Sequence, residues 1–296
     1  MTTPLGQLLS DSWDMCRKNI RTLVIGALLF GTLVAVVGAV ANRRIEGHIW
    51  QGMQRMGIEQ NEMMELQRKI QSGEENAVQE AMMEMQRMGG KMDKMTDEER
   101  EAFFAKEGMM MMRGMLPVMG GGMLWWLFVA LFSTSYYLLL ALGKAKEPVD
   151  ILNLSVKKVL PLFGVWMWSM LRSFIWIPIL GIIPAIILGP RFALSSVLLV
   201  DKNMGVRASV ASSHSRTRGY WGKIIGNTLA VGIVTVLASW VLNIATSPIA
   251  QASTVFGIWT HAVIQQFTMA YSVVFLVLLS KTVMENGVEK YVKKGK

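Results

Sequence analysis

The chain has 296 residues, of which 52% are hydrophobic and only 17% are charged, and its formal net charge is +9. Such an apolar composition excludes an ordinary soluble domain. Cys16 is the only cysteine, so no internal disulfide can form.

Five long apolar runs predict membrane-spanning helices. They lie near residues 21–41, 116–142, 160–200, 224–245 and 255–280. Each reaches or exceeds the roughly 20 residues that cross a hydrocarbon core. The run at 160–200 contains Pro178 and Gly181 near its middle, which predicts two helices joined by a tight turn. The sequence therefore predicts an all-α, polytopic membrane protein with six transmembrane helices.

The distribution of basic residues predicts the orientation of these helices. Lysine and arginine are concentrated before the first span and after the second, fourth and sixth spans. They are nearly absent from the short turns between spans three and four and between spans five and six. Basic loops stay in the cytoplasm, so we expect both termini and the 201–223 loop on that side of a bacterial inner membrane. The first span lacks a small-residue cleavage site and is expected to be an uncleaved anchor.

Residues 42–113 interrupt the apolar pattern. They hold 11 basic and 14 acidic side chains, a net charge of −3, whereas the rest of the chain carries +12. The capping-box spacings of Ser72 with Glu75 and of Thr96 with Glu99 predict helices here. The predicted organisation is an amphipathic helix and first span at 1–41, a methionine-rich extracytoplasmic helical insertion at 42–113, spans two to six at 114–281, and a basic cytoplasmic tail at 282–296.

Three stretches have the pattern of amphipathic helices that end in basic residues and enter a hydrophobic segment. They lie at 5–23, 149–165 and 204–226. This pattern predicts three interfacial helices on the cytoplasmic face. The alternative is that any cytoplasmic loop collects lysine and arginine.

Several positions in these segments carry a family resemblance. They are Ile182–Pro184, Arg191, Val200, Asp201, Ser213, Thr217, Gly219 and Trp221. With the N-terminal stretch at 8–29, they resemble a broad family of bacterial six-helix integral membrane proteins that is similar to the membrane domain of glycerophosphoryl diester phosphodiesterases. The resemblance implies the six-helix fold and no particular chemistry. It departs at the methionine-rich insertion, where we expect the distinguishing feature of this chain.

The sequence predicts no catalytic activity and no cofactor. The three histidines, His48, His214 and His261, are remote in sequence from any paired carboxylates. The parallel α/β pattern and metal-binding carboxylates of a phosphodiesterase barrel are missing, and the glycines at 120–122 lack the Lys-Ser/Thr of a phosphate-binding loop. We expect the partners to be the lipid bilayer and a second protein, and not a nucleic acid.

Two arginines are candidates for contact with a lipid headgroup. Arg191 falls within the predicted fourth span, and no predicted span contains an acidic residue that could pair with it. It could hold an anionic lipid or substrate headgroup between helices. Alternatively, Pro190 breaks the helix and Arg191 extends to the interface. Arg172, beside the predicted external turn, could reach headgroups directly.

The methionines support the main functional hypothesis. Of 24 methionines, 17 lie between Met53 and Met123. As adaptable apolar side chains they predict a docking surface, although thioethers also suit Cu(I). We therefore expect a non-catalytic scaffold or accessory subunit. The alternatives are a transporter or lipid-handling protein with a site near Arg191, and a Cu(I)-handling protein. The candidate docking residues are Met85, Met88, Met109, Met110, Met111 and Met112.

Overall fold

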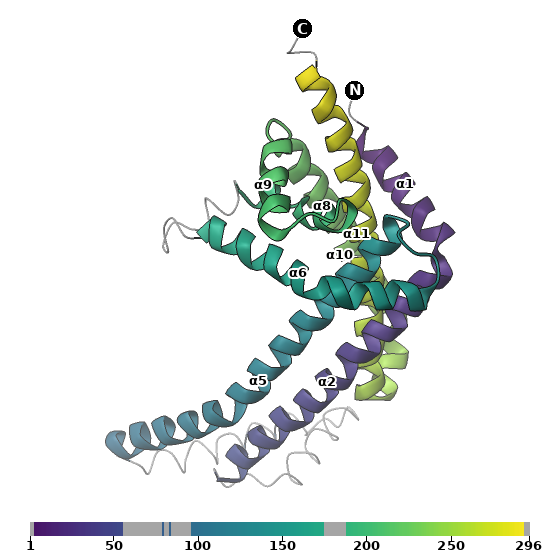
Figure 1. The fold of residues 1–296 in the computed structure, drawn as a ribbon. Coiled ribbons are helices and arrows are strands. Elements are labelled where there is room, and N and C mark those ends of the chain that lie inside the picture. Colours follow the sequence, from purple (N-terminus) through teal and green to yellow (C-terminus); the bar gives the residue numbers. More distant parts are fainter. Residues whose placement is uncertain (1–2, 56–78, 80–82, 84–95, 175–187, 293–296) are drawn as a thin grey trace. The chain divides into compact units, whose positions relative to one another are not determined.

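The computed structural model describes residues 3–55, 79, 83, 96–174 and 188–292, and every regular element in these residues is an α-helix (Figure 1). The all-α prediction is therefore confirmed for this part of the chain. The helices are α1 (Leu5–Lys18), α2 (Ile20–Arg55), α5 (Asp97–Ala141), α6 (Pro148–Phe174), α8 (Ser195–Asp201), α9 (Val206–Arg216), α10 (Trp221–Ala252) and α11 (Thr254–Val292).

Among the described residues, four helical segments are long and apolar enough to cross a membrane. They are Ile20–His48, Gly108–Ala141, Trp221–Pro248 and Thr254–Met284. They overlap the first, second, fifth and sixth predicted spans. This finding is compatible with a multi-pass membrane protein.

The region of the third and fourth predicted spans differs from the expectation. Helix α6 begins at Pro148, carries Lys157, Lys158 and Arg172, and contains no candidate span. Residues 175–187, where the turn between the two spans is predicted, lie outside the described residues. A total of six spans therefore stays a prediction.

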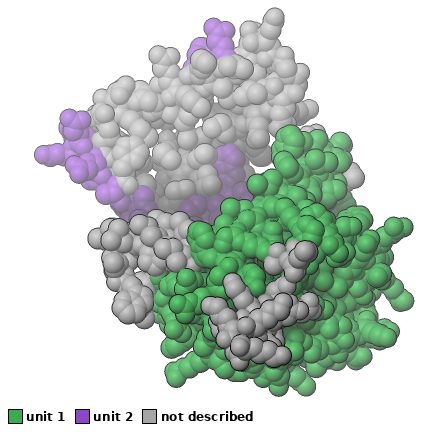
Figure 2. All heavy atoms as spheres, turned by 90° about the horizontal axis from the view of Figure 1, so that it is seen from above, with its two compact units in different colours: residues 1–36, 126–296 green, residues 37–125 purple. Residues whose placement is uncertain are grey.

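The chain divides into two compact units (Figure 2). One comprises Met1–Val36 and Trp126–Lys296, and the other comprises Val37–Trp125. The boundary after Val36 falls inside α2, and the boundary after Trp125 falls inside α5. Helix α2 also continues past position 42, where the predicted insertion begins, and α5 begins well before position 113, where it ends. The predicted insertion is thus partly built from helices that are continuous with two predicted spans. Helix α5 begins directly after Thr96, as the capping box predicts.

In the first unit, α1 packs against α11. Leu8, Ser12 and Cys16 are buried, and their spacing of four residues places them on one helix face. Leu8 joins Ile224 and Phe275 in a buried apolar cluster. Burial of a leucine side chain contributes about 1.5–3 kcal/mol. Helix α1 is therefore held by its own apolar face; its position at a membrane interface stays a prediction.

Helix α2 packs closely on α5 and α11 within the same unit. The Phe30 ring lies edge-on to Phe132 and Tyr136, with ring centroids 5.1 and 5.5 Å away. The Tyr136 hydroxyl donates a hydrogen bond to the Thr22 carbonyl at 3.0 Å. A Cβ atom at Gly31 would lie 2.6 Å from Val263 Cγ2, so glycine permits the α2–α11 approach.

Helix α6 packs on α8 and α9. A Cβ atom at Gly164 would lie 3.0 Å from Val206 Cγ2, which shows that the two helices approach closely there. One turn further along α6, the Arg207 guanidinium lies 5.0 Å from the ring centroid of Trp168, in cation–π geometry. These contacts align α6 with α9 and determine which residues meet at their ends.

Candidate anion-binding site

Arg191 lies in helical residues 188–192, which are followed by a turn and then by α8. This helix continues through Pro190 and ends two residues later, at Phe192. The Arg191 carbonyl accepts hydrogen bonds from the Ser213 hydroxyl at 2.7 Å and the Thr217 hydroxyl at 3.3 Å. Both hydroxyl side chains are buried. The C-terminal end of α9 therefore fixes the backbone from which the Arg191 side chain extends.

The Arg191 guanidinium contacts the imidazole of His214. Arg191 Nη1 lies 3.3 Å from His214 Nε2. Because arginine can only donate, Nε2 must accept, and the imidazole proton is then assigned to Nδ1. The Arg191 Nε atom is buried and has no hydrogen-bond acceptor among the described residues. The guanidinium is therefore oriented on one side and has an unused donor on another.

The charges around His214 are all positive. Burial lowers the pKa of His214 below its ordinary value of 6.5, and the charges of Arg191, Arg172 and Arg218 lower it further. A lowered pKa favours the neutral imidazole that accepts from Arg191. In the described part of the chain, none of these three arginines forms an ion pair. The cluster formed by Arg172, Arg191, His214 and Arg218, here called the arginine cluster, thus carries uncompensated positive charge.

The Asp201 carboxylate pairs with lysines and not with the arginine cluster. Asp201 lies 3.1 Å from Lys144 Nζ and 3.3 Å from Lys202 Nζ. Burial alone would raise its pKa, but hydrogen bonds from both lysines and their charges outweigh burial and lower it. Asp201 is therefore ionised at neutral pH and paired with lysines.

The sequence does not predict that Arg172 and His214 act together. The sequence analysis put Arg172 beside an external turn and put His214 in a cytoplasmic loop. In the structure the charge of Arg172 contributes to the lowered pKa of His214, so we include it in the arginine cluster. Helix α6 packs along α9, with Trp168 of α6 against Arg207 of α9. Arg172 and Arg191, proposed separately from sequence, therefore contribute to one site.

Sequence reasoning missed His214 and Arg218 as members of this site. His214 was assessed by its distance from carboxylates, whereas its neighbours are arginines. A signal was present, because Ser213 and Thr217, two positions of the family resemblance, flank His214 and bind the Arg191 carbonyl.

The candidate docking methionines are only partly described. Met109 and Met112 are 53% and 63% exposed on α5, and Met110 is also exposed. The side chain of Met111 is not described, and Met85 and Met88 lie outside the described residues. The structure is therefore consistent with an accessible methionine surface but does not test docking.

Comparisons of the chain with protein-family models, with curated proteins and with solved structures found no match. The family resemblance carried by Arg191, Ser213 and Thr217 thus stays a prediction. Within the described ranges, no group of three or more His, Cys, Asp or Glu side chains could hold a metal ion. Function must be argued from the arginine cluster and the exposed surfaces.

Proposed function

We propose that this chain is a non-catalytic, multi-pass protein of a bacterial inner membrane that binds a phosphate-bearing lipid headgroup at the arginine cluster. The observation that carries the proposal is the Arg191 guanidinium, which contacts His214 and has a buried Nε donor without an acceptor, while no arginine of the cluster forms an ion pair with a described residue. Like charges held together repel each other, and an anion between them relieves that repulsion. Phosphate groups supply such an anion at every membrane surface.

The chemistry of the guanidinium group favours phosphate. Arginine presents several N–H donors in a planar fork that matches two phosphate oxygens. His214 Nε2 accepts a hydrogen bond from Arg191 Nη1, which restricts rotation of the guanidinium group. The buried Nε–H of Arg191 has no acceptor among the described residues. A phosphate oxygen at this donor would satisfy a group whose burial without a partner costs about 1–3 kcal/mol.

Native mass spectrometry of the purified protein tests this function. The protein would be mixed with phosphatidylglycerol or with phosphatidylcholine, and the bound lipid counted. We expect Arg191→Leu to weaken phosphatidylglycerol binding about ten- to hundredfold, the equivalent of one charged hydrogen bond. Arg191→Lys should retain part of the affinity, because the charge remains without the fork.

The control variant is Arg113→Leu, which removes an exposed arginine from α5 in the other unit. It should bind phosphatidylglycerol as the original chain does. Equal binding by Arg191→Leu and Arg113→Leu would reject the arginine cluster as the lipid site.

We also propose a multi-pass topology with cytoplasmic termini and interfacial amphipathic helices, with either four spans or the six that the sequence predicts. Its support is the distribution of lysine and arginine together with the four apolar helices. An even number of crossings, four or six, leaves both termini and the 201–223 loop on the same side. The orientation can therefore be tested independently of the number of spans.

A second candidate function is docking of a membrane or extracytoplasmic protein through the methionine-rich region. The observation that favours it is the exposure of Met109 and Met112 on a helix that extends well beyond the length needed to span a bilayer. Methionine is flexible and polarisable and suits a surface that adapts to a partner. Under this hypothesis the protein is a scaffold or accessory subunit.

A further inference from the structure

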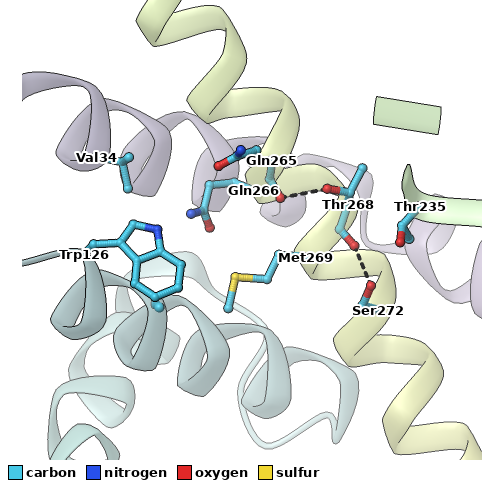
Figure 3. Close-up of a pocket in the computed structure, with 9 residues that line it drawn as sticks. Val34, Trp126, Thr235, Gln265, Gln266, Thr268, Met269 and Ser272 are labelled. Atoms are coloured by element: carbon cyan, nitrogen blue, oxygen red, sulfur yellow. Dashed lines mark hydrogen bonds between the residues drawn. The ribbon is translucent and has the colours of Figure 1, made fainter. Parts of the chain in front are cut away.

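A partly open cavity of about 370 Å³ lies among helices α2, α5, α10 and α11 (Figure 3). All of its lining residues belong to the first compact unit. Val34 and Met269 are the central residues of the candidate spans Ile20–His48 and Thr254–Met284, and Thr235 is at the middle of Trp221–Pro248. The cavity is therefore at the mid-depth of the helices that can cross the membrane.

The cavity is polar at a depth where polar side chains are costly. Five of its lining side chains carry amide or hydroxyl groups, and none of the lining side chains is charged. In a bilayer core such groups are normally satisfied by protein, water or a ligand. The polar lining residues are Thr235, Gln265, Gln266, Thr268 and Ser272.

Gln266 is the most informative of these residues. Its side chain is only 6% exposed, and its Oε1 atom has no hydrogen-bond donor among the described residues. Figure 3 shows its carboxamide directed toward Trp126 across the cavity. A buried carbonyl oxygen without a donor is destabilising unless a donor enters the cavity.

The hydroxyl groups present the same need for donors. Thr268 and Ser272 each donate to a backbone carbonyl of their own helix at 2.9 Å. Thr235 likewise donates to the Val231 carbonyl at 2.9 Å. Each hydroxyl proton is therefore engaged, and only the oxygen lone pairs remain for another molecule.

The amide nitrogen of Gln265 already makes a hydrogen bond within the protein. Its Nε2 lies 2.8 Å from His261 Nε2, and His261 Nδ1 lies 3.0 Å from Asn243 Oδ1. If Asn243 Oδ1 accepts from Nδ1, then His261 Nε2 accepts from Gln265. The cavity thus offers acceptors at Gln266 Oε1 and at the three hydroxyl oxygens, alongside the N–H donors of the Gln266 amide and the Trp126 indole.

We propose that this cavity binds the uncharged, hydroxyl-rich group of a sugar or polyol. Hydroxyl groups both donate and accept, so they can satisfy Gln266 Oε1 and the hydroxyl oxygens of the lining, whereas a phosphate or carboxylate brings only acceptors. The volume would hold about a dozen water molecules, which suits a monosaccharide-sized group and is too large for a bare ion. The apolar walls formed by Val34, Trp126, Ala130 and Met269 suit the carbon skeleton of such a group.

The hydroxyl-rich group could belong to a free polyol or to the headgroup of a neutral glycolipid, and two probes separate these sources. The purified full chain would be placed in phosphatidylcholine nanodiscs. Sorbitol binding would be measured by saturation-transfer NMR, and retention of monoglucosyl diacylglycerol by native mass spectrometry. We expect at least one probe to bind, and the probe that binds identifies the source.

Three variants test the assignment to the cavity. Gln266→Leu removes the unpaired acceptor, and Ala130→Leu fills part of the volume. Each should weaken probe binding about tenfold or more. Thr235→Val removes one acceptor with little change of shape and should weaken binding less. It keeps the test decisive if Gln266→Leu does not fold. The control is Gln51→Leu, the same chemical change at an exposed position of α2 in the other unit.

Two results would overturn the proposal. One is binding of neither probe by the original chain, which would mean that the cavity holds water. The other is binding that Gln266→Leu, Ala130→Leu and Thr235→Val leave at the level of Gln51→Leu, which would mean that the probe binds elsewhere.

Discussion

At Gly31 the backbones of α2 and α11 approach each other closely. An added Cβ would lie 2.9 Å from Val263 Cα and 3.0 Å from its backbone nitrogen, so a side-chain rotation cannot relieve the clash. We expect Gly31→Ala to reduce the free energy of unfolding by about 1–3 kcal/mol, the usual cost of overpacking. Thermal unfolding in detergent, followed by circular dichroism, measures the change.

Gly47 provides a matched control on the same helix. A Cβ atom added at Gly47 would meet no atom within 4 Å, and alanine favours a helix by about 1 kcal/mol over glycine. Gly47→Ala should therefore unfold at the same or a higher temperature. If Gly31→Ala is as stable as Gly47→Ala, the close α2–α11 contact does not exist in the membrane.

His214 should make lipid binding depend on pH. Its pKa is lowered, so without an anion the unfolded chain binds more protons below pH 6.5 and the free energy of unfolding decreases as the pH falls. A bound phosphate offsets the arginine charges, raises the pKa of His214 and couples binding to proton uptake. We therefore expect phosphatidylglycerol affinity to rise as the pH is lowered from 7.5 to 5.5.

The affinity would be measured by lipid titration in nanodiscs at each pH. Phosphatidylglycerol is suitable because its phosphodiester keeps one charge over this range. His214→Gln should abolish the pH dependence, whereas His48→Gln, in the other unit, should retain it. A slope that survives in His214→Gln would assign the titrating group elsewhere.

At the scale of elements, α2 and α5 are longer than a bilayer requires. Their 36 and 45 residues correspond to about 54 and 68 Å of helix, against about 30 Å of hydrocarbon. Much of each helix must therefore lie outside the hydrocarbon core. Met109–Met112 lie at the N-terminal end of the candidate span Gly108–Ala141, whose 34 residues exceed the roughly 20 that a bilayer requires.

The methionines at 109–112 can be tested by two kinds of substitution. Leucine keeps the apolar area and helix propensity, so replacing all four with leucine should preserve binding of a docked partner. Glutamine at the same positions should release the partner, because polar amides would be desolvated at the contact. Quantitative mass spectrometry of proteins that co-purify after gentle detergent extraction measures both effects.

The leucine variant also separates docking from metal binding. It removes four thioether ligands and would abolish Cu(I) binding if these residues hold the metal. Stoichiometric Cu(I) on the purified original chain, lost in the leucine variant, would contradict the docking interpretation and assign a metal-handling role to this helix.

At the scale of the whole molecule, single cysteines at positions 72, 170 and 212 report the topology. Labelling with an impermeant thiol reagent, in cells whose outer membrane has been permeabilised, should modify Ser72→Cys but not Ser212→Cys. Met170→Cys should behave like Ser212→Cys, because Arg172 and His214 belong to one cluster.

Breaking the inner membrane should then expose the two protected cysteines and serves as the control. Labelling of Met170→Cys together with Ser72→Cys would show that α6 crosses the membrane and support six spans. Labelling of Ser212→Cys in intact inner membranes would reverse the proposed orientation.

Sequence patterns predicted the parts of this fold that depend on local composition. Apolar runs identified four long helices, and the Thr96 capping box identified the beginning of α5. The position of α6 was not predictable in this way, because it depends on the contact of Gly164 with Val206, which is a tertiary property. The same holds for the candidate sites. Arg191 was found as an isolated charge, whereas its pairing with His214 and the unsatisfied Gln266 arise only from packing.

Burial of Cys16 on the packed face of α1 has a practical consequence for labelling this protein. Burial raises the pKa of its thiol to about 11. At pH 7 roughly one thiol in ten thousand is then ionised, and the thiolate is the form that reacts. The chain is thus nearly inert toward maleimides and mild oxidants in its native sequence. A fluorophore or spin label attached through one introduced cysteine will report from that position alone.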